Sequence, residues 1–251
     1  MQLHRLEGYI QSLYLVEYPQ GLLLLDGGCR VDVGRILRFI RDQLQRPIGD
    51  LKLVVVTHMH PDHAGAATRL REITGCRIAA GAAPGQWYGG FLGRLMHLAD
   101  VGLAQYVASR QQRPLRNIWY PACLSADLHL NDGDLLPEFP DWQVVSTSGH
   151  TDRDISLLHR DERRIYVADL FVKVKTRFLP PWPIYHPNRY RASLMRLQAL
   201  APVSVILAHG GEVPAEDIDM AKLLAKAPQQ PKTHWRAIKA RFQRFIPLPR
   251  S

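Results

Sequence analysis

The feature that most constrains this 251-residue chain is a histidine-rich segment directly after an apolar run. Residues 57–65 read THMHPDHAG and follow the run LKLVVV of residues 51–56. The run is short, β-branched and ends abruptly in polar residues, which predicts a buried strand. Imidazole and carboxylate groups this close together are typical ligands of zinc, iron or manganese. We therefore expect a metal site at the carboxyl edge of a sheet, where α/β proteins place their active sites.

Three later candidate ligands each follow an apolar run of their own. His150 comes after WQVV at 142–145, Asp169 after RIYV at 164–167, and His209 after VSVIL at 203–207. Taken alone, each of these would more often be an ordinary loop or capping residue. Together, several strand ends that each present a ligand type predict one site assembled at a sheet edge.

In this order and spacing, the motifs resemble those of the metallo-β-lactamase superfamily, in its glyoxalase II or lactonase-like branch. The family signature THxHxDH matches residues 57–63, and its later motifs match SGHT at 148–151, ADL at 168–170 and LAHG at 207–210. The run LLLLDGG at 22–28 is similar to the family's early strand and aspartate. The resemblance covers roughly residues 8–215. It implies an α/β fold of four αββα layers, with two mixed sheets face to face and helices outside; periodicity alone indicates only α/β.

The resemblance also implies a metal-dependent hydrolase that holds two divalent metal ions. Zinc is favoured, and iron or manganese accept the same ligands. A hydroxide bridging the two ions would be the nucleophile, and Asp62 would be catalytic by orienting it. Asp26 either orients a ligand histidine or is a simple turn aspartate. The first metal would be held by His58, His60 and His150, the second by Asp62, His63 and His209, and Asp169 would bridge them.

The leading functional hypothesis is hydrolysis of an ester-like bond, a lactone or a thioester, in a small molecule. One alternative is a phosphodiesterase or nuclease of the same fold, and the formal net charge of +9 is compatible with it. A nucleic-acid partner is disfavoured because no aromatic and basic stripe stands out. The other alternative is a metal-containing effector-binding protein with little turnover. A glutathione thioester is disfavoured because only about forty residues follow His209.

The chain is expected to form a single domain, 1–251, with an insertion at 82–127 near the active site. The insertion is rich in glycine, aromatic residues and leucine, which predicts a partly helical segment. We expect residues 87–101 to border the substrate pocket; a lid, a dimer contact and a membrane contact stay open for the insertion. Arg94 is the one Lys or Arg within 87–101, which favours a hydrophobic acyl group over a phosphate.

Helical periodicity predicts helices over 32–45, 62–73 and 188–200, with Asn188 as the cap of the last. A hairpin is expected around residues 19–21, and 203–207 should be the last core strand. Asp152, Arg153 and Asp154 either cap a turn, which we favour, or shape the pocket. A basic C-terminal helix and tail is expected at 232–251, with its basic face in solvent.

The cysteine pattern and the hydropathy favour a cytoplasmic protein. Cys29, Cys76 and Cys123 are scattered and odd in number, which argues against a disulfide framework. No apolar stretch approaches the ~20 residues of a membrane span, and no apolar segment of a signal peptide follows the N-terminus. A homodimer is compatible with these features.

Overall fold

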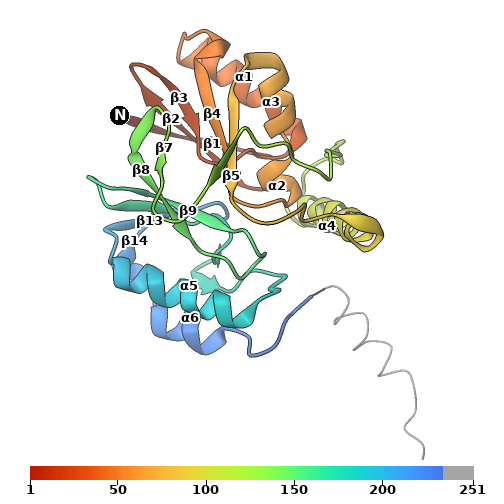
Figure 1. The fold of residues 1–251 in the computed structure, drawn as a ribbon, viewed down its shortest axis with the longest axis vertical. Helices are drawn as coiled ribbons and strands as arrows, with labels where there is room; N and C mark the ends of the chain where they lie inside the picture. Colours follow the sequence, from red (N-terminus) through yellow and green to blue (C-terminus); the bar gives the residue numbers. More distant parts are fainter. Residues whose placement is uncertain (234–251) are drawn as a thin grey trace, which may run out of the picture.

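The computed structural model describes residues 1–233, so the basic segment predicted at 232–251 lies outside the described residues almost entirely. Two sheets form the centre of the molecule, and helices lie on their outer sides (Figure 1). The first sheet has the spatial order β1-β2-β3-β4-β5-β6. Its strands are β1 (Gln2–Glu7), β2 (Ser12–Tyr18), β3 (Gly21–Leu24), β4 (Leu51–Val56), β5 (Arg77–Gly81) and β6 (Leu128–Leu130).

The second sheet has the order β14-β13-β10-β9-β8-β7, and a separate hairpin pairs β11 with β12. Both large sheets are mixed, because β3 to β6 and the pair β10–β13 run parallel while the other neighbours run antiparallel. These strands are β7 (Leu135–Leu136), β8 (Phe139–Ser146), β9 (Ile155–His159), β10 (Arg164–Tyr166), β11 (Val172–Val174), β12 (Arg177–Leu179), β13 (Ser204–Leu207) and β14 (Gly211–Pro214).

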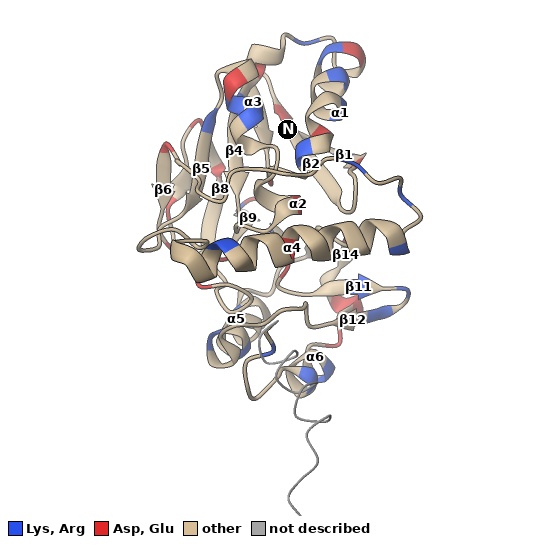
Figure 2. Ribbon diagram, turned by 90° about the vertical axis from the view of Figure 1, so that its right-hand side faces the viewer, with Lys and Arg blue, Asp and Glu red and all other residues tan. Residues whose placement is uncertain are grey.

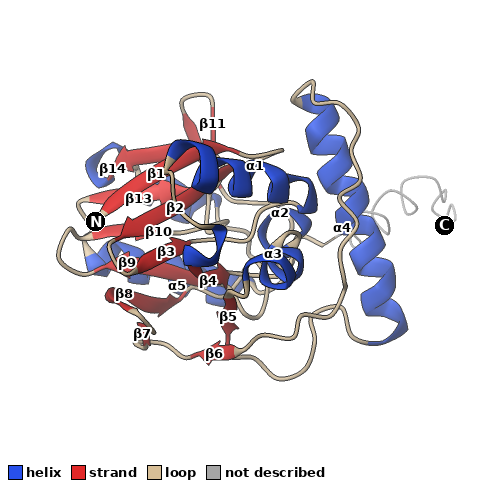
Figure 3. Ribbon diagram, turned by 90° about the horizontal axis from the view of Figure 1, so that it is seen from above, coloured by secondary structure: helices blue, strands red, loops and turns tan. Residues whose placement is uncertain are grey.

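The helices cover both outer faces (Figures 1 and 3). α1 and α3 pack on the first sheet, and α5 and α6 pack on the second. Short 3₁₀ turns occur at Arg30–Asp32, Ile48–Asp50 and Ala215–Asp217, and Phe39–Gln43 is a π turn that extends α1. The helices are α1 (Val33–Arg38), α2 (Pro61–Ala64), α3 (Ala67–Thr74), α4 (Gly90–Arg110), α5 (Pro187–Leu200) and α6 (Met220–Lys226).

Alternation along the apolar strands explains the layers. In β4, Leu53 and Val55 join the core between the two sheets, whereas Val54 and Val56 join the core under α1 and α3. Successive side chains of a strand point to opposite faces, so a continuous apolar run is buried on both sides. The predicted four-layer αββα fold is therefore confirmed.

Some local predictions need correction. The helix expected over 62–73 is split into α2 and α3, because the N–H group of Ala66 donates to the carbonyl oxygen of Gly28 instead of to that of Asp62. α5 begins at Pro187, with His186 rather than Asn188 in the cap position. Residues 203–207 are not the last strand, since β14 follows after a tight turn at Gly210 and Gly211 and pairs with β13. The hairpin around 19–21 is confirmed.

Candidate metal centre

All seven sequence-predicted ligands come together at one edge of the two sheets. The segment after β4 supplies four of them, and the loops after β8, β10 and β13 supply one each: His58, His60, Asp62 and His63, then His150, Asp169 and His209. They form two groups whose ligand atoms lie within 4.8 Å of one another. The first group is His58, His60, His150 and Asp169, and the second is Asp62, His63 and His209.

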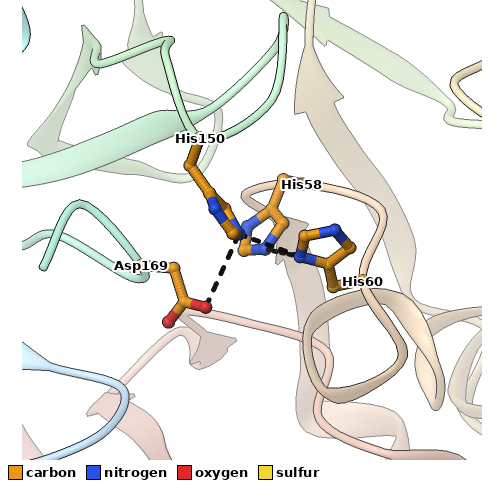
Figure 4. A group of neighbouring side chains, drawn as sticks. All are labelled: His58, His60, His150 and Asp169. Carbon is orange, nitrogen blue, oxygen red and sulfur yellow. Dashed lines mark hydrogen bonds and ion pairs between the residues drawn. The ribbon is translucent and has the colours of Figure 1, made fainter. Parts of the chain in front are cut away.

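In the first group, three imidazoles point toward a common centre (Figure 4). Nδ1 of His60 lies 3.1 Å from Nε2 of His58 and 2.9 Å from Nε2 of His150. Three ring nitrogens can face one another this closely only if protons or a cation lie between their lone pairs. The first group therefore has the donor geometry of a cation site.

Asp169 connects the two groups. Its Oδ2 lies 3.7 Å from Nε2 of His150, and its Oδ1 lies 3.5 Å from Nε2 of both His63 and His209. On the far side, Oδ2 of Asp62 lies 3.1 Å from Nε2 of His209 and 3.6 Å from Nε2 of His63. The two carboxylates are thus interleaved with imidazoles, as N and O donors around two cations would be.

Further side chains fix which ring nitrogens face the centre. The Nδ1 group of His63 lies 2.6 Å from Oδ2 of Asp26, and the hydroxyl groups of Thr57 and Tyr166 donate to the same oxygen over 2.7 and 3.0 Å. Asp26 is therefore not a simple turn residue. Because it occupies Nδ1 of His63, the Nε2 atom is left to face the centre.

The loop that carries His150 is held by its own carboxylate. Asp154 accepts hydrogen bonds from the backbone N–H groups of Gly149 and Thr151 over 3.0 and 2.7 Å. Burial raises the pKa of Asp154 to about 6. Nδ1 of His150 lies 2.5 Å from the carbonyl oxygen of Pro183, which leaves Nε2 for the centre. Asp154 thus caps the turn, as favoured from the sequence, while Arg153 pairs with Asp152.

The electrostatics of the two groups differ. Burial lowers the pKa of His58 well below its ordinary value and that of His60 to about 4, so both imidazoles are neutral near pH 7. For His63, burial opposes the charge, but the neighbouring carboxylates, Asp26 first, outweigh it and raise the pKa. For Asp169, burial favours the neutral acid, but the charge of His63 holds the pKa well below its usual value. A cation bound there would displace the proton of His63.

The residues present fit a metal. Nε2 of His63 and Oδ1 of Asp169 are buried and lack a hydrogen-bond partner, and both face the centre. Burying a polar atom without a hydrogen-bond partner costs free energy, so we expect these two atoms to contact a bound cation. The cluster can therefore bind metal ions, and its donor set accepts zinc, iron and manganese alike.

Sequence reasoning missed Asp100, which is 2% exposed and lies on α4. Its Oδ2 lies 3.6 Å from Nε2 of His60 and accepts a hydrogen bond from the Tyr88 hydroxyl over 2.8 Å. The carboxylate faces the ring nitrogen of His60 that points away from the centre, so it favours the tautomer with Nδ1 free. A lone aspartate within an apolar helix was the one signal for it in the sequence.

We expect Asp100→Asn to weaken metal affinity by about ten-fold, at the lower end of the effect of such outer partners. The amide keeps the volume and loses the charge that faces His60. Competition with a chelator measures the affinity, and Asp42→Asn, at an exposed position, is the control. An affinity equal to that of the control would show that Asp100 does not orient His60.

A cavity of about 420 Å³ opens over the centre. His60, Asp62, Asp169 and His209 lie at one side of it. Of the predicted border 87–101, only Asp100 lines the cavity; α4 contributes residues further along instead, so that prediction was wrong in position. The remaining lining includes Ile10, Leu103, Ala104, Val107, Gln111, Val172, Lys173, Val174, Leu179, Pro180, Pro181 and Trp182.

Comparison with known proteins agrees with this geometry. The model of the metallo-beta-lactamase superfamily matches residues 6–209. The probable metallo-hydrolase YqjP of Bacillus subtilis (strain 168) is 25% identical over 221 residues, which cover 79% of this chain and 66% of that protein. The chain thus spans just under two thirds of that relative's length. The probable metallo-hydrolase YflN of the same strain is 23% identical over 240 residues, 82% of this chain and 83% of YflN.

Among solved structures, TTHA1623 in a di-iron-bound form superimposes with a TM-score of 0.57 at 20% identity, over 91% of this chain and 99% of that one. Fold and site together define a class of protein in which a metal-binding cluster lies at the edge of two facing sheets. The chain belongs to the metallo-beta-lactamase superfamily. The family predicted from the sequence is therefore confirmed.

Proposed function

We propose that this protein is a dinuclear metal hydrolase of an ester-like bond, a lactone or a thioester, in a substrate with a hydrophobic acyl part. One observation carries the proposal: an apolar cavity opens directly onto two adjoining groups of metal-binding side chains. Zinc is our first choice, and the di-iron form of the structural relative supports iron as the alternative. The three cysteines are free thiols, which is consistent with a cytoplasmic setting.

The seven residues His58, His60, Asp62, His63, His150, Asp169 and His209 would hold two ions, with Asp169 between them. Ions bound there would supply a water whose pKa is lowered to about 7 and would polarise the carbonyl oxygen of the substrate. The chain's own contribution is to hold these donors rigidly, through Asp26 and Asp154, and to keep Asp62 within 3.1 Å of His209. Asp62 lines the cavity, so it can accept a proton from an attacking water.

We expect metal-replete protein to hold two ions per chain. The reason is that two groups of donors adjoin through one carboxylate, Asp169. Elemental analysis after gel filtration measures the ratio of metal to protein. At most one tightly bound ion would contradict the dinuclear proposal.

We also expect turnover efficiency to fall as the acyl part of the substrate is shortened. Leu103, Ala104, Val107 and Leu179 line the cavity, and each buried methylene is worth about 0.8 kcal/mol, close to four-fold in binding. The comparison is kcat/KM across a series of lactones and thioesters that differ in chain length. Equal efficiency along the series would remove the argument for a hydrophobic acyl part.

The cavity also bears on the alternatives. Among the described residues that line it, Lys173 is the one Lys or Arg. A phosphodiester would need a convergent cluster of such groups, so the nuclease alternative has less support. If turnover were fastest on phosphodiesters, the nuclease alternative would be preferred. If lactones, thioesters and phosphodiesters were all left unchanged, an effector-binding protein would be favoured.

A further inference from the structure

The outer side of α4 exposes large apolar side chains. Phe91, Leu98 and Tyr106 are 78%, 52% and 61% exposed, and Gly102 between the last two is exposed as well. These positions follow one another at intervals of seven, four and four residues, which places them on one side of a helix. α4 lies along an edge of the molecule in Figure 3 and is almost entirely uncharged in Figure 2. Several large apolar side chains exposed on one side of a helix are a candidate interaction site.

The segment after α4 extends this surface. Trp119 is 52% exposed, and its ring lies edge-on to the ring of His97 on α4, with the centroids 4.9 Å apart. Leu115 is 81% exposed. We call the whole set the α4 surface: Phe91, Leu92, Leu98, Tyr106, Leu115 and Trp119.

Within residues 86–121, the stretch that carries the α4 surface, the exposed charged side chains are all arginines. Between residues 86 and 121 the acidic residue is Asp100, which is buried on the opposite side of α4. The same stretch carries four arginines. Arg113 pairs with Glu7, while Arg94, Arg110 and Arg116 are exposed. The surface therefore combines apolar and aromatic side chains with three exposed arginines, and the exposed acid beside it, Glu7, is paired with Arg113.

We propose that the α4 surface docks on an anionic lipid bilayer, with α4 lying in the plane of the interface. Apolar side chains enter the boundary between head groups and acyl chains, tyrosine and tryptophan favour that level, and arginines meet the lipid phosphates. No helix among residues 1–233 is long and apolar enough to cross a bilayer. A two-fold contact with a second copy would place these arginines against one another, which disfavours that occupant.

This inference goes beyond the proposed hydrolysis and does not depend on it. The opposite side of α4 supplies Leu103, Ala104 and Val107 to the cavity. One helix would thus have the bilayer on one side and the metal-facing cavity on the other. Such a placement suits a substrate that partitions into lipid.

The test is co-sedimentation of the full chain with vesicles of phosphatidylcholine, with and without phosphatidylglycerol. We expect binding to the anionic vesicles, weakened by salt, and at least ten-fold weaker for the double variant Leu98→Glu, Tyr106→Glu. Neither residue lines the cavity. Met195→Glu is the matched control, because Met195 on α5 is 57% exposed and distant in sequence from the α4 surface. The control should bind as the unchanged chain does.

Several outcomes would overturn the proposal. Absence of binding by the unchanged chain would do so directly. Full binding by the double variant would assign the interaction to another part of the chain, such as the basic residues after 233. A dimer in light scattering that the double variant dissociates, without vesicle binding, would identify a second copy as the occupant. Equal binding to pure phosphatidylcholine would remove the role of the arginines and the anionic lipid.

Discussion

Asp62→Ala should lower hydrolytic turnover by roughly a thousand-fold and leave the protein folded. The Asp62 carboxylate faces His209 at 3.1 Å and His63 at 3.6 Å, and it lines the cavity. The backbone carbonyl of Asp62 accepts a hydrogen bond from the Gln11 side chain. The alanine variant keeps this carbonyl, so we expect the fold to be retained. The measurement is kcat/KM on the best substrate of the panel, with thermal unfolding in parallel.

Asp161→Ala, at an exposed turn, is the control for the loss of one negative charge. Turnover of Asp62→Ala within three-fold of that control would exclude a catalytic role for Asp62. Loss of cooperative unfolding in Asp62→Ala would instead show that Asp62 is needed for a stable fold.

Asp26→Asn should weaken metal affinity by about 10- to 100-fold and also destabilise the fold. Both carboxylate oxygens of Asp26 only accept: Oδ2 faces Thr57, His63 and Tyr166, and Oδ1 accepts from the N–H groups of Gly27 and Thr57. Whichever way the amide turns, its NH₂ group meets donors, and each buried donor left without an acceptor costs about 1–3 kcal/mol.

The chelator competition used for Asp100→Asn allows a direct comparison. Asp26 lies 2.6 Å from the ring nitrogen of His63, whereas Asp100 lies 3.6 Å from that of His60. The larger loss of affinity is therefore expected for Asp26→Asn. The reverse order would mean that these contacts do not control the orientation of the ligand histidines.

The candidate site could be predicted from the sequence because metal ligands can be recognised by their residue types. His58, His60 and His63 directly follow an apolar strand, and few structures other than a ligand loop explain that pattern. The layer order followed in the same way, since apolar runs such as 22–25 and 53–56 are buried on both faces.

The wall of the cavity could not be predicted, because α4 is apolar on both sides. Phe91 and Leu98 are exposed while Leu103 and Val107 line the cavity, so hydrophobic periodicity carries no signal about which side faces inward. Asp100 was missed for a related reason: its importance depends on contact with His60, which only the folded chain creates. β14 was missed because it is short and Val213 is the one large apolar residue among its Gly, Glu, Val and Pro.

The two groups of donors also bear on how the molecule is assembled. Each group takes residues from the segment after β4 in the first sheet and from a strand end of the second sheet. Neither set of donors exists until the two sheets have closed on each other, and His209 comes late in the chain. Complete binding of the ions would therefore require both sheets to be in place, and bound ions would cross-link the two sheets. Removal of the metal would therefore destabilise the packing of the two sheets against each other before it unfolds either sheet.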